Sequence, residues 1–229
     1  MASKLALDAV RNMNPETPLR RNQHIYIVDD DAAVTRALAR GLGQLGFDVH
    51  QFQSARNFLE RAVIFRPAML VIDMQMPECN GVELQAMLKT KGWHLPVIFI
   101  SGESTVIQGI TAMKQGALDF LVKPFDFDRL CELIDRAIEL DTRHIQAQAL
   151  QQACQRLLDR LKPRELEAYR CLAQGQSYRE MMLALDISLP TAKQYRTAVM
   201  RKMGFATLAM LLQFDKDLHL SESLTKSSH

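Results

Sequence analysis

Apolar residues in the first two thirds of the chain follow two alternating patterns. Short apolar runs bounded by Gly, Pro or acidic residues predict buried strands, and they span 24–28, 47–52, 69–73, 96–101 and 120–122. Segments with apolar residues at helical spacing predict helices, and they span 33–45, 54–63, 82–90, 105–115 and 126–140. Strands that alternate with helices predict an α/β fold with a doubly wound, five-stranded parallel sheet in the order 2-1-3-4-5.

The last third of the chain has a purely helical pattern. Helical periodicity continues through 138–161 without Pro or Gly, and a heptad seam is formed by Leu133, Leu140, Ala147, Cys154 and Leu161. This seam predicts contact between two protomers, or packing of one face against the sheet domain. Four helices with short connections are predicted after it, at 163–173, 178–185, 189–203 and 206–214.

These patterns predict two domains, which a length of 229 residues accommodates. The sheet domain is expected at 23–140, a helical linker at 141–161 and an all-α domain at 162–214. A flexible N-terminal extension is expected at 1–22, with a short helix possible at 4–13, and a flexible tail at 215–229.

Charge divides the chain into an acidic front and a basic back. Residues 24–138 hold eleven Lys and Arg against fourteen Asp and Glu, whereas residues 162–214 hold eight against four. The two halves are therefore expected to have different partners.

Cysteine spacing and hydropathy indicate a cytoplasmic protein. The four cysteines, Cys79, Cys131, Cys154 and Cys171, have no C-x-x-C spacing and no neighbouring His pair, which predicts reduced thiols rather than a zinc site. No apolar run reaches the length of about eighteen residues that spans a bilayer, and the N-terminus has no signal-peptide pattern. We expect a cytoplasmic location and no membrane partner.

Polar side chains follow four of the predicted strands: Asp29 and Asp30, Asp73, Ser101, and Lys123. In the strand order proposed above, these strands are neighbours, so their carboxyl ends converge in one crevice. Three carboxylates held close together repel one another and require a cation, and oxygen ligands favour Mg²⁺. A carboxylate in such a site is also a potential nucleophile that forms an acyl phosphate, with Lys123 neutralising the phosphoryl oxygens and Ser101 donating a hydrogen bond.

Four motifs in order resemble the receiver domain of two-component response regulators: Val28-Asp29-Asp30, Asp73-Met74-Gln75-Met76-Pro77 with Gly81, Ser101-Gly102, and Lys123-Pro124-Phe125. The resemblance covers 24–140 and implies a flavodoxin-like receiver. It implies that Asp73 accepts phosphate from a sensor histidine kinase, and that Asp29, Asp30 and Asp73 hold Mg²⁺. It also implies that Ser101 is the switch hydroxyl, Phe120 the switch aromatic and Lys123 the phosphoryl-contacting lysine, with a cis bond between Lys123 and Pro124.

The two middle helices of the basic domain, joined by a tight turn, predict a helix-turn-helix. The second helix is expected to bury Leu189, Ala192, Val199 and Met203 and to expose Lys193, Gln194 and Thr197. Four motifs in this part of the chain resemble those of a LuxR-type DNA-binding domain: Leu161-x-Pro163-Arg164-Glu165, Gly175-x-Ser177, Ile187-Ser188-x-x-Thr191-x-Lys193 and Arg201-Lys202-Met203-Gly204. The family usually has Gly, Val and His where this chain has Asp186, Ala192 and Tyr195.

A receiver followed by this domain resembles the NarL/FixJ class of response regulators. The resemblance implies that DNA is contacted by Lys193, Gln194, Tyr195, Arg196, Thr197 and Arg201. We therefore expect a transcriptional regulator, not an enzyme, that binds double-stranded DNA and forms a homodimer on phosphorylation.

Two alternatives remain open. The first is an aspartyl-phosphate enzyme of phosphatase type, which is disfavoured because Gln75 stands where such an enzyme has a second catalytic Asp. The second is a phosphorylation-switched module whose helical domain binds proteins rather than DNA.

Overall fold

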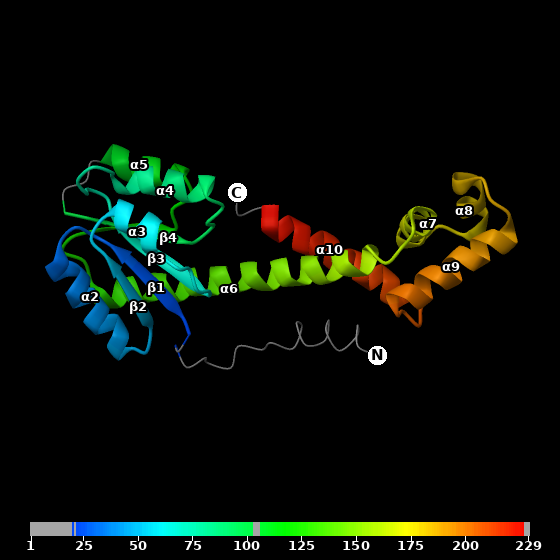
Figure 1. The fold of residues 1–229 in the computed structure, drawn as a ribbon, viewed down its shortest axis with the longest axis horizontal. Coiled ribbons are helices and arrows are strands. Elements are labelled where there is room, and N and C mark those ends of the chain that lie inside the picture. The colour runs from blue at the N-terminus through cyan, green and yellow to red at the C-terminus, as the bar shows by residue number, and fades with distance from the viewer. Residues whose placement is uncertain (1–19, 21, 103–105, 227–229) are drawn as a thin grey trace. The chain divides into compact units, whose positions relative to one another are not determined.

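A computed structural model describes residues 20, 22–102 and 106–226, and these divide into two compact units with the boundary between Ile145 and Gln146 (Figure 1). The predicted extension at 1–22 lies outside the described residues, except for Arg20 and Asn22. Each unit has its own hydrophobic core.

The N-terminal unit is a five-stranded parallel sheet in the order β2-β1-β3-β4-β5, which confirms the predicted topology. Its strands are β1 (His24–Val28), β2 (Asp48–Phe52), β3 (Ala68–Asp73), β4 (Val97–Ser101) and β5 (Asp119–Val122). Its helices are α2 (Ala32–Gln44), α3 (Ala55–Arg61), α4 (Gly81–Thr90), α5 (Val106–Lys114) and the first part of α6 (Phe127–Leu158).

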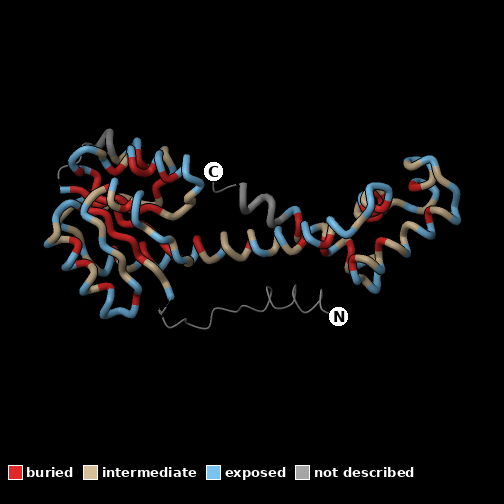
Figure 2. The backbone as a smooth tube through the Cα atoms, in the orientation of Figure 1, coloured by how far each residue is buried: buried red, intermediate tan, exposed pale blue. Residues whose placement is uncertain are grey.

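Helices cover both faces of the sheet (Figure 1). Alternate residues of β1 point to opposite faces, so that Tyr26 and Val28 pack with α3 and α4, while Ile25 and Ile27 pack with α2 and α6. The central strand β3 is buried along its whole length (Figure 2). This double burial explains why the strands read as continuous apolar runs in the sequence.

Helix α4 begins in close contact with the end of β3. A Cβ atom on Gly81 would lie 2.6 Å from the backbone oxygen of Asp73 and 2.8 Å from the ring of Phe99. Only glycine therefore fits at this point without a shift of the backbone. The helix is fixed there by a capping box, in which Asn80 accepts from the backbone N–H of Glu83 and the Glu83 carboxylate accepts from the backbone N–H of Asn80.

The C-terminal unit contains α7 (Pro163–Ala173), α8 (Tyr178–Leu185), α9 (Leu189–Met203) and α10 (Leu208–Lys226). Ser177 caps α8 by accepting from the backbone N–H of Glu180. Asp186 ends α8 at φ 51°, a left-handed conformation that suits the glycine usual in the family and that Asp tolerates better than most residues.

The predicted seam is divided between the two units: Leu133 is buried in the core of the N-terminal unit and Cys154 in that of the C-terminal unit, while contact between two protomers stays a prediction. Helix α6 continues unbroken to Leu158, and Cys154 and Leu157 are buried in a cluster with Leu211 and Leu218 of α10. Heptad spacing reveals an apolar stripe but does not identify what covers it. Burial, and then the nearby charge of Asp217, raise the pKa of the Cys154 thiol to about 11, so this thiol stays protonated at neutral pH.

The predicted flexible tail is corrected for 215–226, because α10 continues to Lys226, and 227–229 lie outside the described residues. Leu211, Phe214 and Leu218 recur at a spacing of three to four residues and are buried. Within the described part of the chain, the structure has no helix with the length and apolar character needed to cross a membrane.

Candidate functional site

The predicted polar residues converge at the carboxyl ends of the strands. Asp29 follows β1, Asp73 ends β3, Ser101 ends β4 and Lys123 follows β5. Each of Asp29, Asp30 and Asp73 offers a carboxylate oxygen, and these three atoms lie within 4.8 Å of one another. The sheet order brings together side chains that are up to 94 residues apart in the sequence.

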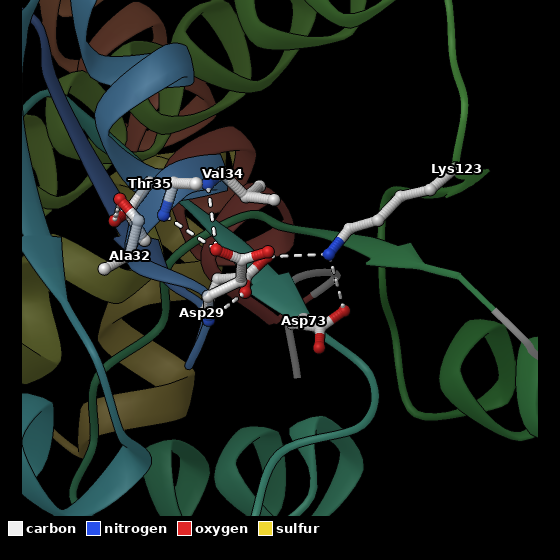
Figure 3. Close-up of polar contacts among 8 residues, drawn as sticks. Asp29, Ala32, Val34, Thr35, Asp73 and Lys123 are labelled. Carbon is white, nitrogen blue, oxygen red and sulfur yellow. Dashed lines mark hydrogen bonds and ion pairs between the residues drawn. The ribbon is translucent and has the colours of Figure 1, made fainter.

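Lys123 lies between two of the carboxylates (Figure 3). Its Nζ atom donates to Asp29 Oδ2 at 2.8 Å and forms an ion pair with Asp73 Oδ1 at 3.3 Å. The other Asp29 oxygen accepts from the backbone N–H of Asp31 at 2.8 Å. Asp31 itself caps α2 by accepting from the backbone N–H of Ala33. Its role therefore differs from that of Asp29 and Asp30. The peptide bond between Lys123 and Pro124 is cis, as predicted.

Burial controls the protonation of the site. Burial, and then the charge of Asp29, raise the pKa of Asp73, while Lys123 partly offsets both effects. Burial lowers the pKa of Lys123, but its hydrogen bond and charge interactions with Asp29 and Asp73 outweigh burial and raise it overall. Lys123 therefore remains an ammonium, and one ammonium faces three carboxyl groups.

Among the described residues, two buried polar atoms of the site have no hydrogen-bond partner: Ser101 Oγ, and Asp73 Oδ1, which has the ion pair with Lys123. Because buried polar atoms normally have partners, these two have capacity for a further group. Phe120 is half-buried on β5, beside the α3–α4–α5 face of the sheet. Ser101 and Lys123 thus lie at the same end of the sheet as the carboxylates, whereas Phe120 lies further back on β5, opposite Phe99.

Asp73→Asn should stabilise the N-terminal unit at pH 7 in the presence of EDTA. The pKa of Asp73 is raised by folding, so its ionised form is disfavoured in the folded chain relative to the unfolded chain. This penalty is absent below the unfolded pKa of about 3.9 and grows as the pH rises through the folded pKa.

Urea unfolding can be followed through Trp93, the single tryptophan of the chain, which packs against Phe58 in the N-terminal unit. We expect a higher unfolding midpoint for the variant at pH 7, and midpoints that converge with the wild type as the pH approaches about 4. A variant that is less stable than the wild type at pH 7 would contradict this account of the site.

The predicted DNA-contacting residues all lie on α9, and they form two groups that differ in exposure. Four of them are exposed, Lys193, Gln194, Thr197 and Arg201, whereas Tyr195 and Arg196 are half-buried. Ala192, Val199 and Met203 are buried as predicted, but Leu189 is 40% exposed because it is the first residue of the helix.

The sequence gives no indication of one further contact in this region. Tyr178, at the start of α8, contacts Arg196 through both its hydroxyl and its ring. The two residues are 18 positions apart on different helices, so only the tertiary structure brings them together.

The comparisons with known proteins agree with this geometry. The family described as "Response regulator receiver domain" matches residues 25–135, and the family "Bacterial regulatory proteins, luxR family" matches residues 159–214. The fold and site therefore define a receiver joined to a helix-turn-helix DNA-binding domain.

Relatives match this chain over most of its length and most of their own. Nodulation protein W of Bradyrhizobium diazoefficiens is 31% identical over 89% of this chain and 90% of its own. The transcriptional regulatory protein FixJ of the same organism is 35% identical over 83% and 93%. The solved structure of the response regulator StyR matches with a TM-score of 0.75 at 31% identity, over 85% of this chain and 98% of that one. The chain belongs to the NarL/FixJ class of two-component response regulators and is a DNA-binding transcriptional regulator.

Proposed function

We propose that Asp73 accepts a phosphoryl group from a sensor histidine kinase, and that Asp29, Asp30 and Asp73 hold Mg²⁺ for this transfer. The observation that carries the proposal is the cluster of three carboxylate oxygens within 4.8 Å beside the Lys123 ammonium. All-oxygen donors match the preference of Mg²⁺, and a bound Mg²⁺ neutralises charge on the phosphoryl oxygens.

The remaining residues of the site have separate roles in this proposal. Lys123 holds its charge next to the Asp73 oxygen, where phosphoryl oxygens would gather. Ser101 has a buried hydroxyl with no hydrogen-bond partner in the described part of the chain, and this hydroxyl is suited to donate to a phosphoryl oxygen. Phe120 is half-buried and turns inward as Ser101 moves toward the phosphate, which changes the surface formed by α5 and β5.

The changed surface favours a homodimer, and the dimer presents two copies of α9 to double-stranded DNA. Two recognition helices that bind adjacent major grooves lie about 34 Å apart. Lys193, Gln194 and Thr197 face the bases, and basic residues beside them face the phosphates. Binding should therefore weaken steeply as salt concentration rises.

Phosphorylation of the full-length protein tests this function. The protein is incubated with acetyl phosphate and Mg²⁺, and the dimer fraction is measured by analytical ultracentrifugation. Binding to genomic DNA fragments, selected beforehand with the phosphorylated protein, is measured by fluorescence anisotropy. We expect both dimerisation and DNA affinity to rise for the wild type, and EDTA to abolish both responses.

Asp73→Asn is the matched control, because it keeps the shape of the side chain and removes the nucleophilic carboxylate. Its dimer fraction and DNA affinity should not respond to acetyl phosphate. An equal response in the variant would contradict the assignment of Asp73. Continuous release of phosphate by the wild type without any change in DNA binding would favour the phosphatase-type alternative.

A further inference from the structure

The side chain of Arg196 is held by Tyr178 in the C-terminal unit. Arg196 Nη1 donates to the Tyr178 hydroxyl at 3.2 Å, and the guanidinium carbon lies 5.4 Å from the centre of the Tyr178 ring. A guanidinium that contacts an aromatic ring and its hydroxyl together has far fewer conformations than a solvated arginine. Arg196 is half-buried, in contrast to the exposed Lys193 and Arg201 on the same helix.

Helical geometry places Arg196 at the edge of the DNA-facing surface. Successive residues of an α-helix are rotated by about 100°. Lys193, Thr197 and Arg201 therefore lie within about 80° of one another, and Arg196 lies roughly 60° from Lys193, on the side of the buried stripe. This is the side on which Tyr178 and the start of α8 are found. In a helix-turn-helix, the first helix crosses the DNA backbone while the second enters the groove.

We propose that Tyr178 is a positioning residue that orients Arg196 to bind one phosphodiester group of the DNA backbone. Of the five N–H donors of Arg196, one is directed to Tyr178 and the others remain for phosphate oxygens. The Tyr178 hydroxyl accepts from Arg196 and keeps its own proton, which can be donated to the same phosphate. The two side chains together form one contact with the DNA backbone at the junction of α8 and α9.

This inference rests on the proposed entry of α9 into the major groove. The contact between Tyr178 and Arg196 favours DNA binding by pre-organisation, because an arginine already ordered in the free protein loses less conformational entropy when DNA binds. The contact carries no base sequence information and fixes the register of α9 on the duplex.

A double-mutant cycle on the phosphorylated full-length protein tests the inference. DNA affinity of the wild type, Tyr178→Ala, Arg196→Ala and the double variant is measured by fluorescence anisotropy at several salt concentrations, with the genomic fragments described above. Arg196→Ala should lower the salt slope by about one, the value for one lost phosphate contact. Tyr178→Ala should weaken binding by roughly three- to tenfold in the wild type and by clearly less in the Arg196→Ala background, where only the hydrogen bond from the Tyr178 hydroxyl to the phosphate is lost.

Two further variants separate positioning from a purely structural role. Tyr178→Phe keeps the ring and loses the hydroxyl, so its affinity should fall between those of the wild type and Tyr178→Ala. The pair of Tyr178→Ala with Arg201→Ala is the matched control, because Arg201 is basic and lies on the same helix away from Tyr178; these two effects should multiply. Circular dichroism melting of each variant identifies any loss of folding.

Multiplying effects of Tyr178→Ala and Arg196→Ala would overturn the inference, and so would tighter DNA binding by Tyr178→Ala. These results would leave the proposed function intact as long as Lys193→Ala weakens binding. If neither Lys193→Ala nor Arg196→Ala weakens binding, the proposed entry of α9 into DNA is wrong, and the inference falls with it.

Discussion

Asp141→Ala should lower the free energy of unfolding of the N-terminal unit by about 3 kcal/mol, the lower end of the range for breaking a buried ion pair. The Asp141 side chain is 1% exposed. It accepts from both Nε and Nη2 of Arg66 and from the backbone N–H of Ala68, the first residue of β3. Alanine removes the acceptor for all three donors. The lower end of the range applies because Arg66 remains 26% exposed, so water takes over part of the lost interaction.

Urea unfolding followed through Trp93 fluorescence measures this loss. Asp135→Ala is the matched control, because Asp135 lies on the same helix and pairs with Arg20 at 2.8 Å, but its side chain is 49% exposed. An exposed pair of this kind contributes about 0–1 kcal/mol. If the two variants lose the same stability, the buried pair does not fix α6 to the sheet.

The position of Asp141 bears on where the receiver ends. The receiver family matches only to residue 135, and the sequence pattern predicts the domain end at residue 140. The ion pair with Arg66 holds α6 to the sheet for at least one further residue. We propose that the functional receiver includes Asp141. Sequence patterns miss this boundary because the two partners are 75 residues apart, and helical periodicity continues unchanged past the contact.

The sheet order and the acidic crevice were predictable because local patterns determine them. Buried strands such as β3 read as apolar runs that end in a polar residue, and parallel strands place such residues at one edge. The residues that cover Cys154 and the contact between Tyr178 and Arg196 were not predictable in the same way. Each depends on which surfaces of two helices meet, and amphipathic spacing reveals a face without its partner.

The same limitation explains the wrong prediction of a flexible tail. Residues after Phe214 are mostly polar, and the LuxR family matches only to residue 214. In the structure, Asp215 accepts a hydrogen bond from the Tyr169 hydroxyl at 2.7 Å, and Leu218 is buried beside Cys154. Burial, and then the interaction with Asp215, raise the pKa of Tyr169, so its hydroxyl remains a donor throughout the physiological range.

A chain that ends at Phe214 should therefore lose about 3–5 kcal/mol of stability in its C-terminal unit. The truncation leaves the Tyr169 hydroxyl, on a residue 4% exposed, without its acceptor, at a cost of about 1–3 kcal/mol. It also removes Leu218, whose burial contributes about 1.5–3 kcal/mol. The terminus then lies at Phe214 itself, so that the last turn of the shortened α10 frays.

Hydrogen–deuterium exchange of the full-length and truncated chains measures this loss, because exchange is measured peptide by peptide and so reports on the stability of each unit separately. Amides of α7 and α9 should exchange roughly 140- to 4,000-fold faster in the truncated chain, while amides of β1 and β3 should be unchanged. A chain that ends at Lys226 keeps all of α10 and should exchange like the wild type. Leu218→Ala in the full-length chain should give an intermediate rate, since it removes the apolar contact and keeps the hydrogen bond between Tyr169 and Asp215. Equal protection of α7 in the Phe214-terminated and Lys226-terminated chains would show that the later turns of α10 do not stabilise the DNA-binding unit.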